Sequence, residues 1–193
     1  MGLRVSFELS NADLKHFRSI MREARETAAE KPAAEIFAAA KKLLDSVADI
    51  DTPEFVSDRL ARIEVMIDMV QDREWALPAA DAARVTSALA YFGEPEDLIP
   101  DHIPGLGFLD DAIMVELVVR ELRHEIDAYA DFCRYREVEE RKRGGRDAED
   151  ETTREAWLSV RRKELQSRMR DRRLRERTRR GARSGGRSPF SLF

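Results

Sequence analysis

The sequence has little cysteine and no long apolar run. Its one cysteine, Cys133, can form neither an internal disulfide nor a site in which several thiolates hold a metal. The most apolar segment starts at Ala112 but meets Glu116 and Arg120 before the roughly 20 residues that a membrane crossing needs. The start, "MGLRVSFELS", lacks the apolar centre of a secretion signal. We therefore expect a cytoplasmic location and no transmembrane segment.

The familiar motifs of catalysis and cofactor binding are also missing. The chain contains no HExxH zinc pair, no EF-hand loop and no glycine loop that would cradle phosphates. His102 has no visible partner in the sequence that would form a base–nucleophile pair. We expect no cofactor, and the sequence predicts no catalytic residue.

Charge is abundant and unevenly distributed. Residues 1–133 hold 14 basic and 27 acidic side chains, whereas residues 134–193 hold 20 basic and 11 acidic ones. With 193 residues and 42% hydrophobic content, the chain can form one domain with a sizeable core and an extension. The sequence therefore predicts an acidic body with a basic end, an asymmetry typical of proteins that meet an anionic partner.

Apolar residues recur at helical spacing through most of the body, which predicts an all-α bundle of about five helices. Ser10 or Asn11 can cap the first helix, and Pro32, Pro53 and Pro78 each suit the start of a later one. The fifth helix is expected from Asp110 to the glycines at 144 and 145. The alternation of Leu3 to Leu9 predicts only a short strand or an extended arm.

The C-terminal region differs in composition from the body. Residues 152–180 have the pattern of a charge-rich helix with too few apolar residues to own a core, and the last residues have the composition of a disordered tail. The expected domains are a helical domain at 1–143, whose central part is 77–131, and a basic region at 144–193.

The stretch "DLIPDHIPGLGFLDD", residues 97–111, combines turn residues with large apolar ones. Its prolines disfavour helix at the preceding isoleucines, and its glycines permit positive φ, so the chain must turn sharply. The apolar residues predict that the loop folds back onto the bundle, where buried backbone amides need partners. The residues of this possible binding loop are Asp97, Pro100, Asp101, Pro104, Gly105, Gly107, Asp110 and Asp111.

Two roles are open for the loop aspartates. They can cap turns and helix starts, with Asp110 and Asp111 complementing the dipole of the fifth helix. Alternatively, carboxylates that converge could hold Mg²⁺ or Ca²⁺. The capping role is preferred because the spacing matches no known ligand frame, and the metal question is left open. His102, among apolar residues, is expected to be a packed or partly exposed ring.

The segment "ALAYFGEPEDLIPDHIPGLGFLDDAIMV", from Ala88 to Val115, resembles the YkvA-type domain, a small bacterial helical family of unknown function. The resemblance rests on a Leu-Ile-Pro-Asp, Ile-Pro, Gly and Leu-Asp-Asp series and covers roughly residues 77–131. It implies an α-helical fold and brings no established reaction, substrate or cofactor. Many members are membrane-associated through neighbouring apolar segments, which are missing here, so the resemblance leads us to expect a soluble variant.

The basic end offers a set of side chains that could neutralise phosphates or carboxylates. Aromatic residues are nearly absent there, so base stacking is not expected, and the thin apolar stripe of Leu158, Leu165, Met169 and Leu174 does not favour a membrane surface. The alternative is that this helix docks on the acidic body of its own chain or of another copy. The candidate binding residues are Arg161, Arg162, Lys163, Arg168, Arg170, Arg172, Arg173, Arg175, Arg177, Arg179 and Arg180.

Three functional classes follow from these patterns. The preferred one is a non-enzymatic helical interaction or scaffold module whose basic tail engages a protein partner. The second is a nucleic-acid-associated protein that uses the arginine-rich tail. The third is a metal-dependent, hydrolase-like enzyme that uses the aspartate loop.

Overall fold

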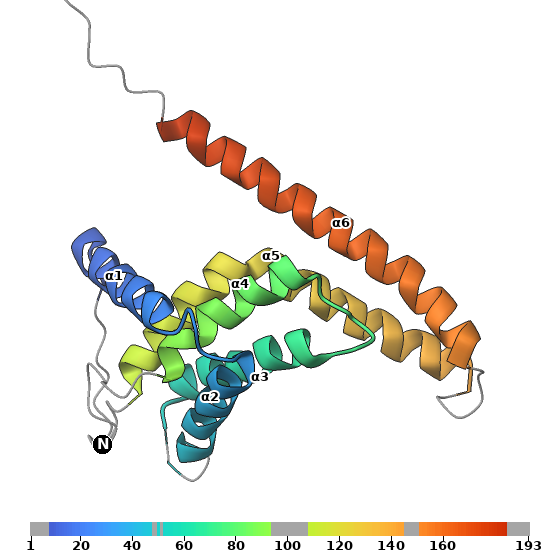
Figure 1. The fold of residues 1–193 in the computed structure, drawn as a ribbon, viewed down its shortest axis with the longest axis horizontal. Helices are drawn as coiled ribbons and strands as arrows, with labels where there is room; N and C mark the ends of the chain where they lie inside the picture. Colours follow the sequence, from blue (N-terminus) through green and yellow to red (C-terminus); the bar gives the residue numbers. More distant parts are fainter. Residues whose placement is uncertain (1–7, 48–49, 51, 94–107, 145–150, 185–193) are drawn as a thin grey trace, which may run out of the picture. The chain divides into compact units, whose positions relative to one another are not determined.

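The computed structural model describes residues 8–47, 50, 52–93, 108–144 and 151–184. Every regular element in these ranges is helical, which confirms the all-α prediction (Figure 1). The predicted N-terminal strand or arm falls at residues 1–7, apart from its last residues, and the predicted disordered tail falls at residues 185–193. Both ranges lie outside the described residues.

The first four helices begin at the capping residues and prolines that the sequence analysis identified. They are α1 (Asn11–Thr27), α2 (Ala33–Val47), α3 (Glu54–Gln71) and α4 (Ala79–Leu89), and the last continues into a 3₁₀ turn, η1 (Ala90–Gly93). Ser10 caps α1 through a capping box with Asp13: the Ser10 hydroxyl accepts from the Asp13 amide, and the Asp13 carboxylate accepts from the Ser10 amide. These hydrogen bonds lower the pKa of Asp13. The starts of α2, α3 and α4 each come directly after a proline, as predicted.

Two long helices complete the fold. Helix α5 runs over Leu109–Lys142 and ends just before Gly144, whose φ of 87° is the left-handed conformation that glycine supplies at a helix end. Helix α6 runs over Glu151–Ser184. The contacts divide the chain into two compact units, and α5 contributes to both of them.

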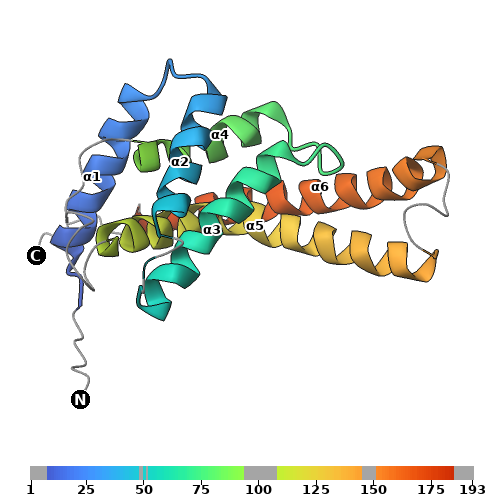
Figure 2. The same cartoon turned by 90° about the horizontal axis from the view of Figure 1, so that it is seen from below.

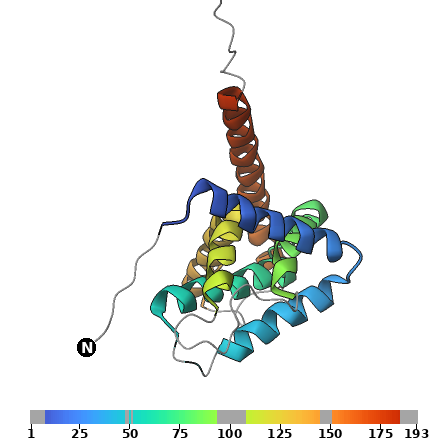
Figure 3. The ribbon, with the colours of Figure 1, turned by 90° about the vertical axis from the view of Figure 1, so that its left-hand side faces the viewer.

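Unit 1 comprises residues 1–71 and 77–121. Helix α2 packs against α3, α4 and η1, and α1 packs against η1 and α4. Figure 3 shows α1 lying across α4 and the first part of α5, and a salt bridge of 2.9 Å joins Arg25 of α1 to Glu121 of α5. The core is apolar and includes fully buried side chains from α3, α4 and α5, among them Ile63, Met66, Ile67, Val85, Leu89, Met114, Val115 and Val118.

Unit 2 comprises residues 72–76 and 122–193. Within it, the second part of α5 and helix α6 run in opposite directions as a helical hairpin (Figure 2). The first five of the seven residues between α3 and α4, Asp72–Ala76, belong to this unit and supply its largest core side chain, Trp75. Within this unit, α6 shares a core with the second part of α5 and with this turn, and the predicted domains at 1–143 and 144–193 stay a prediction.

From its composition we expected α6 to be a separate charged helix. Instead, α6 packs against other elements of unit 2. Leu158, Leu165 and Met169, from its thin apolar stripe, are buried, whereas Leu174 is 63% exposed. Three apolar side chains suffice because α5 and the Asp72–Ala76 turn provide the rest of the core, including Leu122, Phe132 and Trp75.

Candidate functional site

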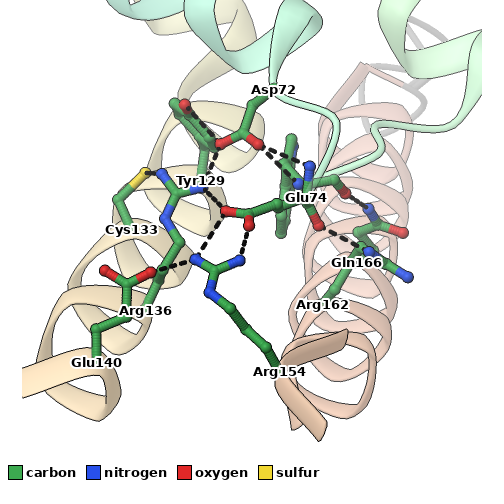
Figure 4. Close-up of polar contacts among 10 residues, drawn as sticks. Asp72, Glu74, Tyr129, Cys133, Arg136, Glu140, Arg154, Arg162 and Gln166 are labelled. Atoms are coloured by element: carbon green, nitrogen blue, oxygen red, sulfur yellow. Dashed lines mark hydrogen bonds and ion pairs between the residues drawn. The ribbon is translucent and has the colours of Figure 1, made fainter. Parts of the chain in front are cut away.

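The Asp72–Ala76 turn is the point at which α6 is held. The Asp72 carboxylate accepts hydrogen bonds from the backbone amides of Glu74 at 2.8 Å and Trp75 at 3.1 Å, which fixes the turn. Ala76 has a φ of 44°, a left-handed conformation that is uncommon for a residue other than glycine. The turn thus directs its carbonyl groups and its acidic side chains toward the other elements of unit 2 (Figure 4).

Helix α5 binds the side chains of this turn. The Tyr129 hydroxyl donates to Asp72 at 3.1 Å, and Arg136 donates to Asp72 at 2.8 Å and to Glu74 at 2.7 Å. Burial raises the pKa of Tyr129, and the nearby Cys133 and Asp72 raise it further, so the phenol keeps its proton. For Arg136, burial is the largest single effect and lowers the pKa, but the Asp72 carboxylate together with Cys133 and Tyr129 outweighs it, so the pKa is raised.

Helix α6 binds the same turn from its own side. Arg154, with 9% of its side chain exposed, pairs with Glu74 of the turn and with Glu140 of α5. Arg162 donates to the Glu74 carbonyl at 2.7 Å, and Gln166 donates to the Trp75 carbonyl at 2.8 Å. Backbone acceptors of the turn are thereby satisfied by side chains of α6, which fixes the position of that helix along the turn.

Further along α6, ion pairs connect it to α5. Arg173 pairs at 2.9 Å with Glu125, a carboxylate that is fully buried, and Glu176 contacts His124 at 2.8 Å and Arg123 at 2.7 Å. A buried carboxylate without a cation would be strongly destabilising, so Arg173 has a structural role in unit 2.

The predicted basic residues therefore differ in their exposure to solvent. Arg162 and Arg173 face the hairpin interior, and Arg161 is partly buried, where it pairs with Glu164 and lies over the Tyr135 ring. Arg180 lies in α6, but its side chain is outside the described residues. The other seven are exposed, and we call them the cationic face: Lys163, Arg168, Arg170, Arg172, Arg175, Arg177 and Arg179.

The cationic face has few counter-charges. Arg168 pairs with Glu164 one turn earlier, and no other member of the face forms an ion pair with a described residue. Residues 168–183 hold nine arginines and two acidic residues. From Arg170 to Arg179 no residue is buried. The last part of α6 is consequently a strongly cationic helix that is exposed to solvent.

The aspartate loop is described only at its end. Asp97, Pro100, Asp101, His102, Pro104, Gly105 and Gly107 lie outside the described residues. Asp110 and Asp111 occupy the first turn of α5, as predicted, and are 1% and 4% exposed. Phe108, just before them, is buried and has a φ of 63°, which is strained for a bulky residue. For the loop aspartates, the capping role and the metal-binding role both stay predictions. No group of three potential ligands is arranged to hold a metal within the described part of the chain.

Sequence reasoning missed the Asp72–Ala76 turn. No local pattern marks Asp72 and Glu74, and the residues that bind them are as many as 88 positions away in the sequence. One signal was present: the fully buried Trp75 follows two acidic residues and precedes Pro78, so a large apolar side chain stands in a short polar connection.

The fold and this arrangement define an all-α protein with a helical bundle and a helical hairpin that displays a cationic helix. Residues 82–117 match the model of a family described as "Protein of unknown function (DUF1232)". The match spans most of α4, η1, the aspartate loop and the start of α5, and it supports the resemblance to the YkvA-type domain that the sequence suggested.

One curated relative is informative. Over 45 residues the chain is 42% identical to the "Uncharacterized membrane protein YkvA" of Bacillus subtilis (strain 168). The match covers 23% of this chain and 42% of that protein, so most of both chains lies outside it. Among the described residues, no helix is long and apolar enough to cross a membrane. No solved structure matches the chain.

Proposed function

We propose that the chain is a non-enzymatic helical interaction module that binds an anionic macromolecule through the cationic face of α6. The observation that carries this proposal is that some arginines of α6 pair within unit 2 while others are exposed to solvent. Arg154, Arg162 and Arg173 hold the helix in unit 2, whereas the seven residues of the cationic face project into solvent, six of them without an ion pair to a described residue.

Electrostatics supports this proposal. Like charges four residues apart on a helix destabilise it, and Arg168 with Arg172 and Arg175 with Arg179 are such pairs. A binding partner that supplies negative charge would relieve this repulsion. Arginine also suits the task because its planar fork pairs with carboxylate or phosphate oxygens through two hydrogen bonds.

The expected protein partner and the two alternatives differ in what supports them. Both an acidic protein segment and a nucleic acid fit the charge of α6. The metal-dependent enzyme would depend on Asp97 and Asp101, which lie outside the described residues, and no observation favours it. We retain a cytoplasmic location as the expectation from sequence, while the curated relative is named a membrane protein.

Retention on a column of heparin, a generic polyanion, tests the proposal. One variant carries Gln at Arg170, Arg172, Arg175, Arg177 and Arg179. A matched control carries Gln at five exposed cations of unit 1, namely Lys15, Arg18, Arg22, Lys41 and Lys42. We expect the α6 variant to elute at much lower salt than the wild type, and the control to elute close to the wild type. Equal elution of the two variants would exclude the cationic face as the binding surface.

A further inference from the structure

The cationic face is organised as two rows along α6. Arg168, Arg172, Arg175 and Arg179 are separated by four, three and four residues, and Lys163, Arg170 and Arg177 by seven each. Each spacing returns to the same side of a helix that turns by about 100° per residue. The rows differ by roughly 170° in helical angle. They therefore lie on opposite flanks of the exposed part of α6.

The strip of helix between the two rows points away from the hairpin interior. The buried residues Leu158, Leu165 and Met169 occupy the other side of α6. The strip carries two acidic residues, two hydroxyl residues and one exposed leucine: Glu164, Asp171, Ser167, Thr178 and Leu174. A partner that contacts both rows must have anionic walls on two sides of the helix, with room for the strip between them.

We infer that the exposed part of α6 binds duplex DNA by lying in the major groove, with one arginine row on each phosphate backbone. This inference rests on the proposed function and names its partner. The major groove of B-form DNA, about 12 Å wide, admits an α-helix, and its two walls carry the phosphates of the two strands. A single strand offers one line of phosphates and would engage one row.

Two other anionic partners fit the arrangement less well. A membrane surface would need a broad apolar face between the rows, and Leu174 is the one large apolar side chain there. Double-stranded RNA has a major groove too narrow for side chains to read. The strip also lacks Arg, Asn and Gln, the side chains that contact base edges through two hydrogen bonds, so binding is expected to have little sequence preference.

Fluorescence anisotropy with a mixed-sequence duplex of about 20 base pairs, two helical turns, tests the inference. The first variant replaces Arg168, Arg172, Arg175 and Arg179 by Gln, and the second replaces Lys163, Arg170 and Arg177. Each phosphate contact contributes about 0.9 to the logarithmic salt slope, so the slope should fall by about 3 to 4 and by about 2 to 3, respectively. The ratio of the wild-type affinity to the affinity of the first variant should fall about a hundredfold between 50 and 200 mM salt.

The control removes the same number of charges elsewhere. Lys15, Arg18, Lys41 and Lys42, all exposed in unit 1, are replaced by Gln, and the salt slope should not change. Equal slopes for the control and the first row variant would mean that net charge alone drives binding. Because Gln is a good helix former, circular dichroism should show unchanged helix content in all variants.

The partner class is tested in parallel with a single-stranded oligonucleotide, a polyglutamate peptide and vesicles containing phosphatidylserine. Loss of affinity from one row alone would overturn the groove arrangement, as would tighter binding to any of these three probes. Heparin retention that depends on α6, together with no binding to duplex DNA at tens of micromolar protein, would refute this inference and leave the proposed function standing. If the α6 substitutions did not change heparin retention and duplex DNA did not bind, both the proposed function and this inference would be refuted.

Discussion

The side chain of Asp72 makes four polar contacts in the Asp72–Ala76 turn and with α5. It accepts two backbone amides, the Tyr129 hydroxyl and the Arg136 guanidinium, and its side chain is 11% exposed. Its negative charge is matched by one cation in a partly desolvated place. Such a pair is strongly coupled to folding, because removing one partner leaves the other charge buried.

An Asp72→Asn substitution tests that coupling. It preserves the shape of the side chain but removes one of the two carboxylates that pair with Arg136, the other being Glu74, so unit 2 should lose about 1 to 3 kcal/mol of stability. Glu137→Gln is the matched control, since Glu137 pairs with Arg141 in a salt bridge whose side chains are 67% and 74% exposed. The control should change stability by less than about 1 kcal/mol. Urea denaturation followed by circular dichroism measures both, and a similar effect of the two variants would contradict the assigned role of Asp72.

Tyr129 makes unit 2 sensitive to alkaline pH. Burial raises the pKa of its phenol above the ordinary value near 10, so the unfolded chain releases this proton at lower pH than the folded chain does. The contribution is complete below pH 10 and is lost as pH rises toward the folded pKa. In Tyr129→Phe, the free energy of unfolding should fall less steeply above pH 10 than in the wild type. Identical pH profiles from denaturation at pH 9 to 12 would show that this phenol is not coupled to folding.

At the scale of elements, α6 is held by few apolar contacts. Leu158, Leu165 and Met169 are spaced by seven and four residues and form one buried line, between polar residues that bind the turn. With so little apolar surface, each of these side chains should contribute a large share of the docking free energy of the helix.

Leu165→Ala should therefore loosen α6. The expected cost is about 2 to 5 kcal/mol, the range for a buried leucine replaced by alanine. Leu174→Ala on the same helix is the control, because Leu174 is 63% exposed. Hydrogen exchange of α6 amides should become faster in the first variant and stay near the wild-type rate in the second. Equal exchange in both would show that the apolar line does not hold the helix.

Local sequence patterns predicted the helices well and the packing of α6 poorly. Ser10, the three prolines and Gly144 mark helix ends through hydrogen bonds and backbone preferences that involve only neighbouring residues, and the helices begin and end where those residues stand. The docking of Gln166 on Trp75 joins residues 91 positions apart. No local pattern shows that Arg162 and Arg173 face inward while Arg172 and Arg175 face solvent, because all four have the same chemistry.

At the scale of the whole molecule, the charge asymmetry of the sequence has two consequences. Part of the basic end is neutralised inside unit 2 by acidic residues of the turn and of α5, including Glu74, Glu125 and Glu140. The remaining positive charge is concentrated on the cationic face. The docked part of α6 therefore anchors the part that we propose to bind a partner.

This anchoring predicts the result of ending the chain at Gly144. Without α6, the carbonyl of Trp75 loses its Gln166 donor, and the carboxylate of Glu74 loses its ion pair with Arg154. The indole of Trp75, 0% exposed in the intact chain, should become accessible to water, and the second part of α5 should fray. Unit 1 has its own apolar core and should keep its cooperative unfolding.

Tryptophan fluorescence measures this outcome directly, because the chain has two tryptophans and the truncation removes Trp157. The emission of the truncated chain then comes from Trp75 alone, and full-length Trp157→Phe gives the matching signal with α6 in place. We expect red-shifted emission and stronger acrylamide quenching in the truncated chain. Circular dichroism should also show a helix loss larger than the residues removed from α6. An unchanged emission maximum and a helix loss equal to α6 alone would mean that the Asp72–Ala76 turn and α5 form a stable unit by themselves, with α6 as an addition rather than a part of their core.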